Sequence, residues 1–281
     1  MKIRYTIVCG VLAVILALTF TACPEEDDPG EGDLQKWTAV EDSTIWGEYS
    51  NNGPYLLGIY GIAYGNNRFV ACSTNGIIAY SADGSSWTAV SDSTFWFNAI
   101  AYGNNRFVAG GDEGKMAYST NGINWTAVED STFTSRINAI TYGNGRFVAV
   151  GSNGKMAYSA DGISWTTVED SKFGSSYVIR AIAYGGGKFV AVGNGGMAYS
   201  TDNGVTWTAV SFGSTDLNAI AYGNNRFVAG GDSGKMAYSA DGESWTAVTE
   251  STFTFVILDI AYGNGRFVAV GSSGKIAYCD W

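Results

Sequence analysis

The sequence predicts an all-β protein built from six similar four-stranded sheets, and three observations support this prediction. A segment of the form WTAV or WTTV recurs about every 40 residues, beginning at Trp37, Trp87, Trp125, Trp165, Trp207 and Trp245. Each repeat contains short pieces with apolar or aromatic side chains at alternate positions, a pattern typical of strands. The chain has 38 Gly but only 3 Pro, a composition that favours short strands and tight turns over helices. Repeats of this length with four strands each are typical of β-propeller blades.

One repeat shows the expected elements in chain order. Residues 98–103 (NAIAYG), 106–111 (RFVAGG), 115–119 (KMAYS) and 125–128 (WTAV) read as strands A, B, C and D, counted outward from the axis. The gaps between them contain Gly, Asn or Asp, residues suited to tight hairpins. Strands A, B and C each occur six times, and the sequence ends at Trp281, just after the sixth strand C.

The last repeat therefore lacks a strand D of its own, whereas residues 37–40 form a strand D with no repeat before it. The simplest arrangement has this N-terminal strand complete the last blade, which leaves no open sheet edge. The sequence thus predicts a closed six-bladed β-propeller over residues 37–281.

The first residues read as a targeting segment. Lys2 and Arg4 precede an apolar stretch over residues 5–20, and small residues stand directly before Cys23. This pattern predicts an export signal over residues 1–22. It resembles a bacterial lipoprotein signal, which implies that Cys23 carries a lipid and tethers the protein to a membrane of the cell envelope, facing the periplasm or the cell surface. An uncleaved anchor helix is the alternative, but the apolar stretch is short for a membrane span.

Residues 23–36 are acidic and contain Pro and Gly, so we expect a solvated linker. The formal net charge is −10 and no basic stripe offsets it, which argues against nucleic acid as a partner.

The chain has no His, which excludes Ser-His-Asp and Cys-His catalysis and any His-ligated metal. We expect no cofactor and no metal, and a monomer. The predicted strand directions place Cys72 and Cys279 at opposite ends of neighbouring blades, too far apart for a disulfide.

The turn between strands C and D carries a repeated motif. STDNGVTW begins at Ser200, and shorter copies begin at residues 81, 119, 159 and 239. These stretches resemble the Asp-box (BNR) repeat, S-x-D-x-G-x-T-W, which implies a propeller of the kind that sialidases have. The acid position of the motif is occupied by Asp83, Asn121, Asp161, Asp202 and Asp241.

We expect these five residues to be structural, accepting hydrogen bonds from the backbone of their own turns while the Trp packs between sheets. The amide of Asn121 supports this reading, because it would poorly replace a catalytic or metal-binding carboxylate.

The strand directions place the D-to-A and B-to-C connections on one face, where the sequence varies most from repeat to repeat. The candidate ligand-binding residues on this face are Trp46, Tyr49, Tyr55, Tyr60, Trp96 and Arg180. Aromatic side chains there can stack on sugars or anchor a protein partner, and packing between blades is the alternative. Arg180 can hold an anionic group by a bidentate contact, or it can form a salt bridge with Glu169 or Asp170.

Tyr60 and Arg180 belong to an aligned set at the starts of the inner strands, which comprises Tyr60, Asn98, Asn138, Arg180, Asn218 and Leu258.

Sialidases use an arginine triad, a Tyr and Glu nucleophile pair, an Asp acid/base and an R-I-P motif. Here RFV stands in place of R-I-P, and only Arg136 and Arg180 fall near the variable face. We therefore expect a non-catalytic binding or scaffolding module with a glycan or an envelope protein as its ligand. One alternative is a sialidase-like glycoside hydrolase. The other is an assembly factor, similar to the Asp-box propellers that help to build membrane complexes.

Overall fold

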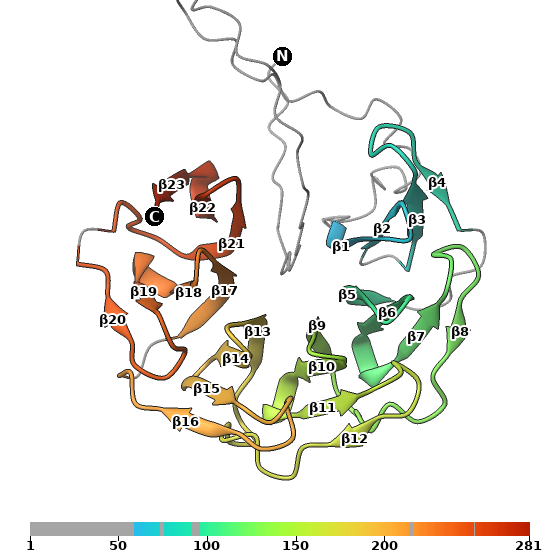
Figure 1. Cartoon of the computed structure of the whole chain (residues 1–281), viewed down its shortest axis with the longest axis horizontal. Helices are drawn as coiled ribbons and strands as arrows, with labels where there is room; N and C mark the ends of the chain where they lie inside the picture. The colour runs from blue at the N-terminus through green and yellow to red at the C-terminus, as the bar shows by residue number, and fades with distance from the viewer. Residues whose placement is uncertain (1–58, 74–75, 91–95, 214–215, 250) are drawn as a thin grey trace, which may run out of the picture.

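The computed structural model describes residues 59–73, 76–90, 96–213, 216–249 and 251–281. These residues form six antiparallel sheets arranged around a central axis, with one strand of each sheet nearest the axis (Figure 1). Five sheets have four strands and the last has three, so the predicted six blades and their strand order are confirmed. In the described part of the chain, no helix is long and apolar enough to cross a membrane.

Each sheet runs outward from the axis in chain order. The first three sheets comprise β1 (Ile59–Gly65), β2 (Arg68–Ser73), β3 (Ile78–Ser81) and β4 (Thr88–Ala89); β5 (Phe97–Gly103), β6 (Arg106–Gly111), β7 (Met116–Ser119) and β8 (Thr126–Ala127); and β9 (Ile137–Gly143), β10 (Arg146–Gly151), β11 (Met156–Ser159) and β12 (Thr166–Thr167). The last three comprise β13 (Ile179–Gly185), β14 (Lys188–Gly193), β15 (Gly196–Ser200) and β16 (Thr208–Val210); β17 (Leu217–Gly223), β18 (Arg226–Gly231), β19 (Met236–Ser239) and β20 (Thr246–Ala247); and β21 (Ile257–Gly263), β22 (Arg266–Gly271) and β23 (Ile276–Asp280).

The core lies between neighbouring sheets. Val108 and Met116 of the second sheet, for example, pack with Ile137, Ile140 and Phe147 of the third. The second strands β6, β10, β14 and β18 are covered on both faces, which explains why RFVAVG and its variants read as almost continuous apolar runs. Burial also raises the pKa of the Cys72 thiol in β2 to about 12. Cys72 and Cys279 are both free thiols.

A glycine at the end of each inner strand allows the next sheet to approach closely. A Cβ atom on Gly143 of β9 would overlap the ring of Tyr184 in β13, and Gly65, Gly103, Gly185 and Gly223 face tyrosines in the same way. Gly263 of β21 has no such neighbour within 4 Å. Among the described residues, therefore, the sixth sheet does not close onto the first, and residues 37–40, predicted to complete it, lie outside the described part of the chain.

The C-to-D turns are held by their own side chains. Asp241 Oδ1 accepts hydrogen bonds from the backbone N–H groups of Glu243 and Ser244, each at 2.8 Å. Ser239 Oγ donates to the same carboxylate at 2.9 Å and accepts from the backbone N–H of Gly242 at 2.8 Å. The same pattern recurs around Asp83, Asp161 and, with one more residue in the turn, Asp202.

Asn121 forms the equivalent bonds with its amide oxygen, which accepts from Ile123 and Asn124 at 2.9 Å each. A negative charge is therefore not required to form the turn.

Basic residues at the start of β2, β6, β10 and β14 link their blades to the next. Arg106 donates to the backbone carbonyl of Asp161 in the following C-to-D turn, and its guanidinium lies 5.1 Å from the ring centroid of Tyr118 in its own sheet. Arg68 and Lys188 contact the corresponding turns of the next blades through Asn121 and Asp241.

At the last blade, Trp281 takes the place of such a turn. Arg226 lies 4.8 Å from its ring centroid, and Tyr238 and Phe267 also contact its ring.

Candidate functional site

A β-bulge interrupts the inner strand of every sheet at the same place. In β13, for example, Ile179 pairs with Gly193 and Ala181 pairs with Val192, which leaves Arg180 without a partner in the register. The residues at this position are Tyr60, Asn98, Asn138, Arg180, Asn218 and Leu258. Bulges redirect a side chain out of the regular alternation of a strand. We call these six residues the bulge ring.

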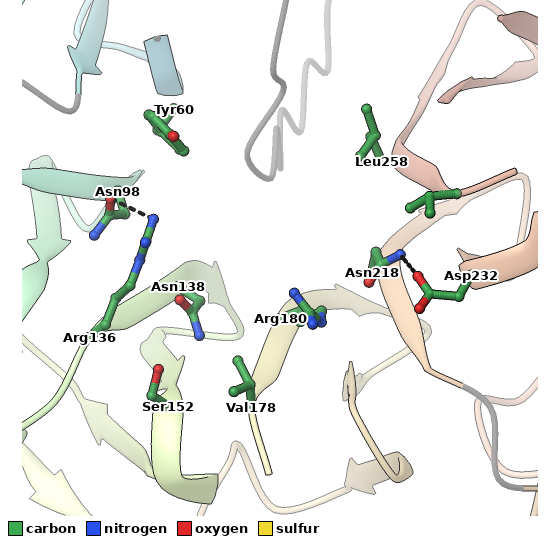
Figure 2. A pocket seen from close by; sticks show the side chains of 11 residues that line it. Tyr60, Asn98, Arg136, Asn138, Ser152, Val178, Arg180, Asn218, Asp232 and Leu258 are labelled. Carbon is green, nitrogen blue, oxygen red and sulfur yellow. Dashed lines mark hydrogen bonds between the residues drawn. The ribbon is translucent and has the colours of Figure 1, made fainter. Parts of the chain in front are cut away.

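All six side chains of the bulge ring line one cavity of about 470 Å³ at the axis of the propeller. Figure 2 shows Tyr60, Asn98 and Arg136 on one side of this cavity, and Leu258, Asn218 and Asp232 on the other. The remaining lining residues are Asn138, Ser152, Val178, Arg180 and Val256. The repeat thus delivers one side chain per blade to a shared space, and the residue types differ between blades.

Two of the three asparagines of the ring join neighbouring blades. Asn138 Nδ2 donates to the carbonyl of Ile179 at 2.8 Å, and Asn218 Nδ2 donates to the carbonyl of Ile257 at 3.2 Å. Both carbonyls belong to the first residue of the next inner strand. These amides therefore satisfy strand ends, as buried backbone groups require.

A second set of contacts joins three of the polar ring residues to the B-to-C turns of their own blades, 14 residues later. Asn98 Nδ2 donates to Asp112 at 2.8 Å, and Asn218 Nδ2 donates to Asp232 at 2.9 Å. Arg180 takes the same role with its Nε, which donates to Asn194 Oδ1 at 2.7 Å. Within the described part of the chain, Nε is the one guanidinium nitrogen of Arg180 that donates a hydrogen bond.

The two arginines of the cavity have different surroundings. Arg136 donates from Nη2 to Asn98 Oδ1 at 2.9 Å, and its Nε lies 3.5 Å from Asp112 Oδ1. Its guanidinium also lies 5.8 Å from the ring centroid of Tyr60. Arg136 is therefore paired with an acid and covered by an aromatic ring.

Arg180 is half-buried, and no carboxylate of the described residues lies within 4.0 Å of its guanidinium. The amide of Asn194 lies between it and Asp216, whose Oδ2 is 3.5 Å from Asn194 Nδ2. A salt bridge with Glu169 or Asp170, one of the two readings of the sequence, is wrong. Asp170 instead pairs with Lys172, two residues away on the same loop.

The other candidate residues have different outcomes. Tyr60 lines the same cavity as Arg180. Trp96, whose side chain is 59% exposed, borders a separate cavity of about 270 Å³ together with Asp112, Glu113 and Lys115. Trp46, Tyr49, Tyr55 and the lipidation residue Cys23 lie outside the described residues. The described part of the chain contains no group of three or more Cys, Asp or Glu that could hold a metal.

Asp232 and Asn194 were not predicted as site residues. The signal that could have found them is the constant spacing between ring position and turn, which places a polar residue 14 positions after Asn98, Arg180 and Asn218.

Comparisons with known proteins agree on the fold. A family model described as the DUF6242 β-propeller domain matches residues 97–218, which include four of the six ring positions. This protein has a β-propeller fold. No curated protein sequence matches the chain.

Solved structures with this fold include YCF48 bound to a D1 peptide, at 18% identity and a TM-score of 0.62 over 80% of this chain and 78% of that one. They also include YCF48 from Cyanidioschyzon merolae, at 18% identity and a TM-score of 0.61 over 79% of this chain and 82% of that one. The computationally designed protein Ika8 is similar at 14% identity, with a TM-score of 0.63 over 79% of this chain and 71% of that one. At these identities the likeness concerns the fold alone.

Proposed function

We propose that this protein is a non-catalytic binding module of the bacterial cell envelope, tethered through a lipid on Cys23, that binds an anionic group of a glycan or an envelope protein inside the bulge ring. The observation that supports this most directly is Arg180. At the equivalent position of two other blades, Asn138 and Asn218 donate a hydrogen bond to the next blade. Arg180 has a half-buried cation in place of that amide.

The chemistry of Arg180 fits this role. Its Nε is held by Asn194, which fixes the plane of the guanidinium while leaving its terminal nitrogens for a ligand. A carboxylate can accept two parallel hydrogen bonds from such a fork. Because the side chain is already oriented, little conformational freedom is lost when the ligand binds.

The composition of the cavity supports a non-catalytic role. Glycoside hydrolysis requires two positioned carboxyl groups on opposite sides of the scissile bond. Among the described residues that line the cavity, Asp232 is the single acid. Asp112, which stands at the equivalent place in the second blade, is paired with Arg136.

One solved structure supports the possibility that the ligand is a protein, because it contains YCF48, a protein of this fold, bound to a D1 peptide.

The same proposal includes a closed ring, in which residues 37–40 form the missing strand of the last sheet. In the first blade Ala79 pairs with Ala89 and Tyr80 pairs with Thr88. Transferring this register to β23 pairs Ala277 with Ala39 and Tyr278 with Thr38. The exposed fractions of Ile276 and Tyr278, 67% and 65%, support a missing neighbour at this edge.

The test uses the full-length protein in detergent on an array of acidic and neutral glycans, together with crosslinking in native envelopes. We expect Arg180→Gln to weaken capture of the ligand about tenfold or more. Lys172→Gln removes the same charge from the D-to-A connection of the same blade, outside the cavity, and should leave capture unchanged. Equal capture by wild type and Arg180→Gln would overturn the cavity as the binding site, and turnover in a fluorogenic sialidase assay would overturn the non-catalytic role.

A further inference from the structure

The cavity contains a second charged group without a counter-charge. Asp232 accepts a hydrogen bond from Asn218, but no Lys or Arg nitrogen of the described residues lies within 4.0 Å of its carboxylate. Arg180, on the preceding blade, has no carboxylate of the described residues within the same distance. Two opposite charges therefore line one cavity without contacting each other.

The repeat provides an internal comparison that explains this arrangement. Asp112 occupies the same position in the second blade as Asp232 in the fifth, since each accepts from the ring asparagine 14 residues earlier. The next blade supplies Arg136 to Asp112, directly before its inner strand. At the corresponding place before β21 stands Val256, which cannot form an ion pair. In the second blade, an arginine of the next blade pairs with the acid at this position. In the fifth blade, Asp232 has no such arginine among the described residues.

Three apolar side chains, those of Val178, Val256 and Leu258, line the same cavity as the two charges. Figure 2 shows Val178 next to Arg180, and Leu258 on the same side of the cavity as Asn218 and Asp232. Aliphatic side chains favour an apolar group between the two charges and offer no partner to hydroxyl groups, which lose hydrogen bonds with water on burial. A volume of about 470 Å³ lies within the range of small-molecule sites and exceeds what one amino acid fills.

Building on the proposed function, we infer that the bulge ring binds a short peptide with free ends, whose carboxylate contacts Arg180, whose ammonium group contacts Asp232, and whose apolar side chains lie against Val178, Val256 and Leu258. A peptide of two or three residues carries both charges and an apolar group between them. Each of its termini then makes a charge-assisted hydrogen bond, the stronger kind of hydrogen bond in proteins. A sugar acid would satisfy Arg180 but would bring no cation to Asp232.

Isothermal titration calorimetry on the full-length protein in detergent tests the inference. The probes are alanyl-leucine and alanyl-alanyl-leucine, their N-acetyl derivatives, their C-terminal amides, and glucuronate as the sugar acid. We expect the free peptides to bind, and blocking either end to weaken binding about tenfold or more, since each block removes one charged contact.

Two variants assign the ends of the peptide. In Arg180→Gln the free peptide and its amide should bind equally, because the group that senses the carboxylate is gone. In Asp232→Asn the free peptide and its N-acetyl form should bind equally for the same reason. Lys172→Gln and Glu169→Gln, which change one charge each on an exposed loop of the fourth blade, should behave as wild type.

The outcomes separate this inference from the proposed function. Free and blocked peptides that bind equally, or peptides that do not bind at all, overturn the inference. If glucuronate alone binds and Arg180→Gln abolishes that binding, the inference of a peptide ligand is wrong, but the proposal that Arg180 binds an anionic group is retained. If neither class of probe binds and Arg180→Gln also leaves capture from the native envelope unchanged, both proposals fall.

Discussion

The carboxylate of each C-to-D turn bonds mainly to the backbone of its own turn. The backbone N–H groups of Ser244 and Glu243 hold the pKa of Asp241 below its usual range. Those of Ser86 and Ser85 do the same for Asp83. Because these hydrogen bonds favour the charged form, the carboxylates are bound more strongly when ionised than when protonated.

A pH dependence of stability follows. A folded-state pKa below the unfolded value of about 3.9 means that Asp241 stabilises the fold above about pH 4 and loses this contribution as the pH falls further. Asp241→Asn keeps the turn, as Asn121 does, but cannot titrate. We expect its free energy of unfolding, measured in urea, to fall less steeply below about pH 4 than that of wild type. The reverse variant, Asn121→Asp, should make the fall steeper, and equal slopes in all three proteins would contradict the explanation.

At the scale of elements, the basic residue that opens a second strand can contact two blades at once. Arg106 donates to the C-to-D turn of the next blade and lies over Tyr118 of its own. The turn motif and the basic residue therefore form one connection between blades, although the sequence separates Arg106 from Asp161 by 55 positions.

We expect Arg106→Gln to lower the free energy of unfolding by about 1–3 kcal/mol, since it removes a charged hydrogen bond and a cation–π contact. Chemical denaturation measures this. Lys172→Gln, on an exposed loop, should change the same quantity by less than about 0.5 kcal/mol. A loss no larger than that of this control would show that the connection contributes nothing to stability.

Trp281 offers a second test at this scale, because its ring replaces a C-to-D turn against Arg226, Tyr238 and Phe267. It is 38% exposed, so Trp281→Ala should lower the free energy of unfolding by about 1–3 kcal/mol, less than full burial would give. Hydrogen exchange should show the loss of protection concentrated in β23. Trp96→Ala, which removes a more exposed tryptophan, serves as the control, and equal effects would contradict the role of Trp281.

At the scale of the whole molecule, the open question is the contact between the last blade and the first. Five inner strands end in a glycine that lies under a tyrosine of the next blade, and Gly263 has no such neighbour in the structure. A closed ring would place Tyr64 over Gly263.

Alanine substitutions distinguish the two states. Gly143→Ala should lower the free energy of unfolding by about 1–3 kcal/mol, because the added methyl group overlaps the ring of Tyr184. If the ring closes, Gly263→Ala should cost as much. A Gly263→Ala protein as stable as wild type would contradict closure.

The sequence was sufficient to predict the number of blades, the strand order and the alignment of the ring positions, because all three follow from a repeat and a period-two pattern. It was not sufficient for the electrostatics of the site. Asp112 and Asp232 look alike in sequence, and the difference between them arises from the residue before the next blade's inner strand, Arg136 or Val256. The surroundings of Arg180 were equally hidden, because Asp170, one of its two possible partners in the sequence, pairs with Lys172 instead.

The bulges that form the ring were also invisible in the sequence. A one-residue shift in register leaves the alternation of apolar residues readable on both sides of it. The sequence therefore placed Asn138 and Arg180 at the starts of inner strands without showing that they leave the register.

The repeated bulge also bears on how such a protein acquires new specificity. Duplicating a blade copies a position that already points to the axis, before natural selection has acted on what occupies it. A single codon change at Leu258, whose side chain cannot form a hydrogen bond, changes the lining of the cavity and removes no hydrogen bond between blades. At Asn138 or Asn218 the same kind of change also removes a hydrogen bond to the next blade. The framework and the lining of the cavity can therefore vary separately at some ring positions and are coupled at others.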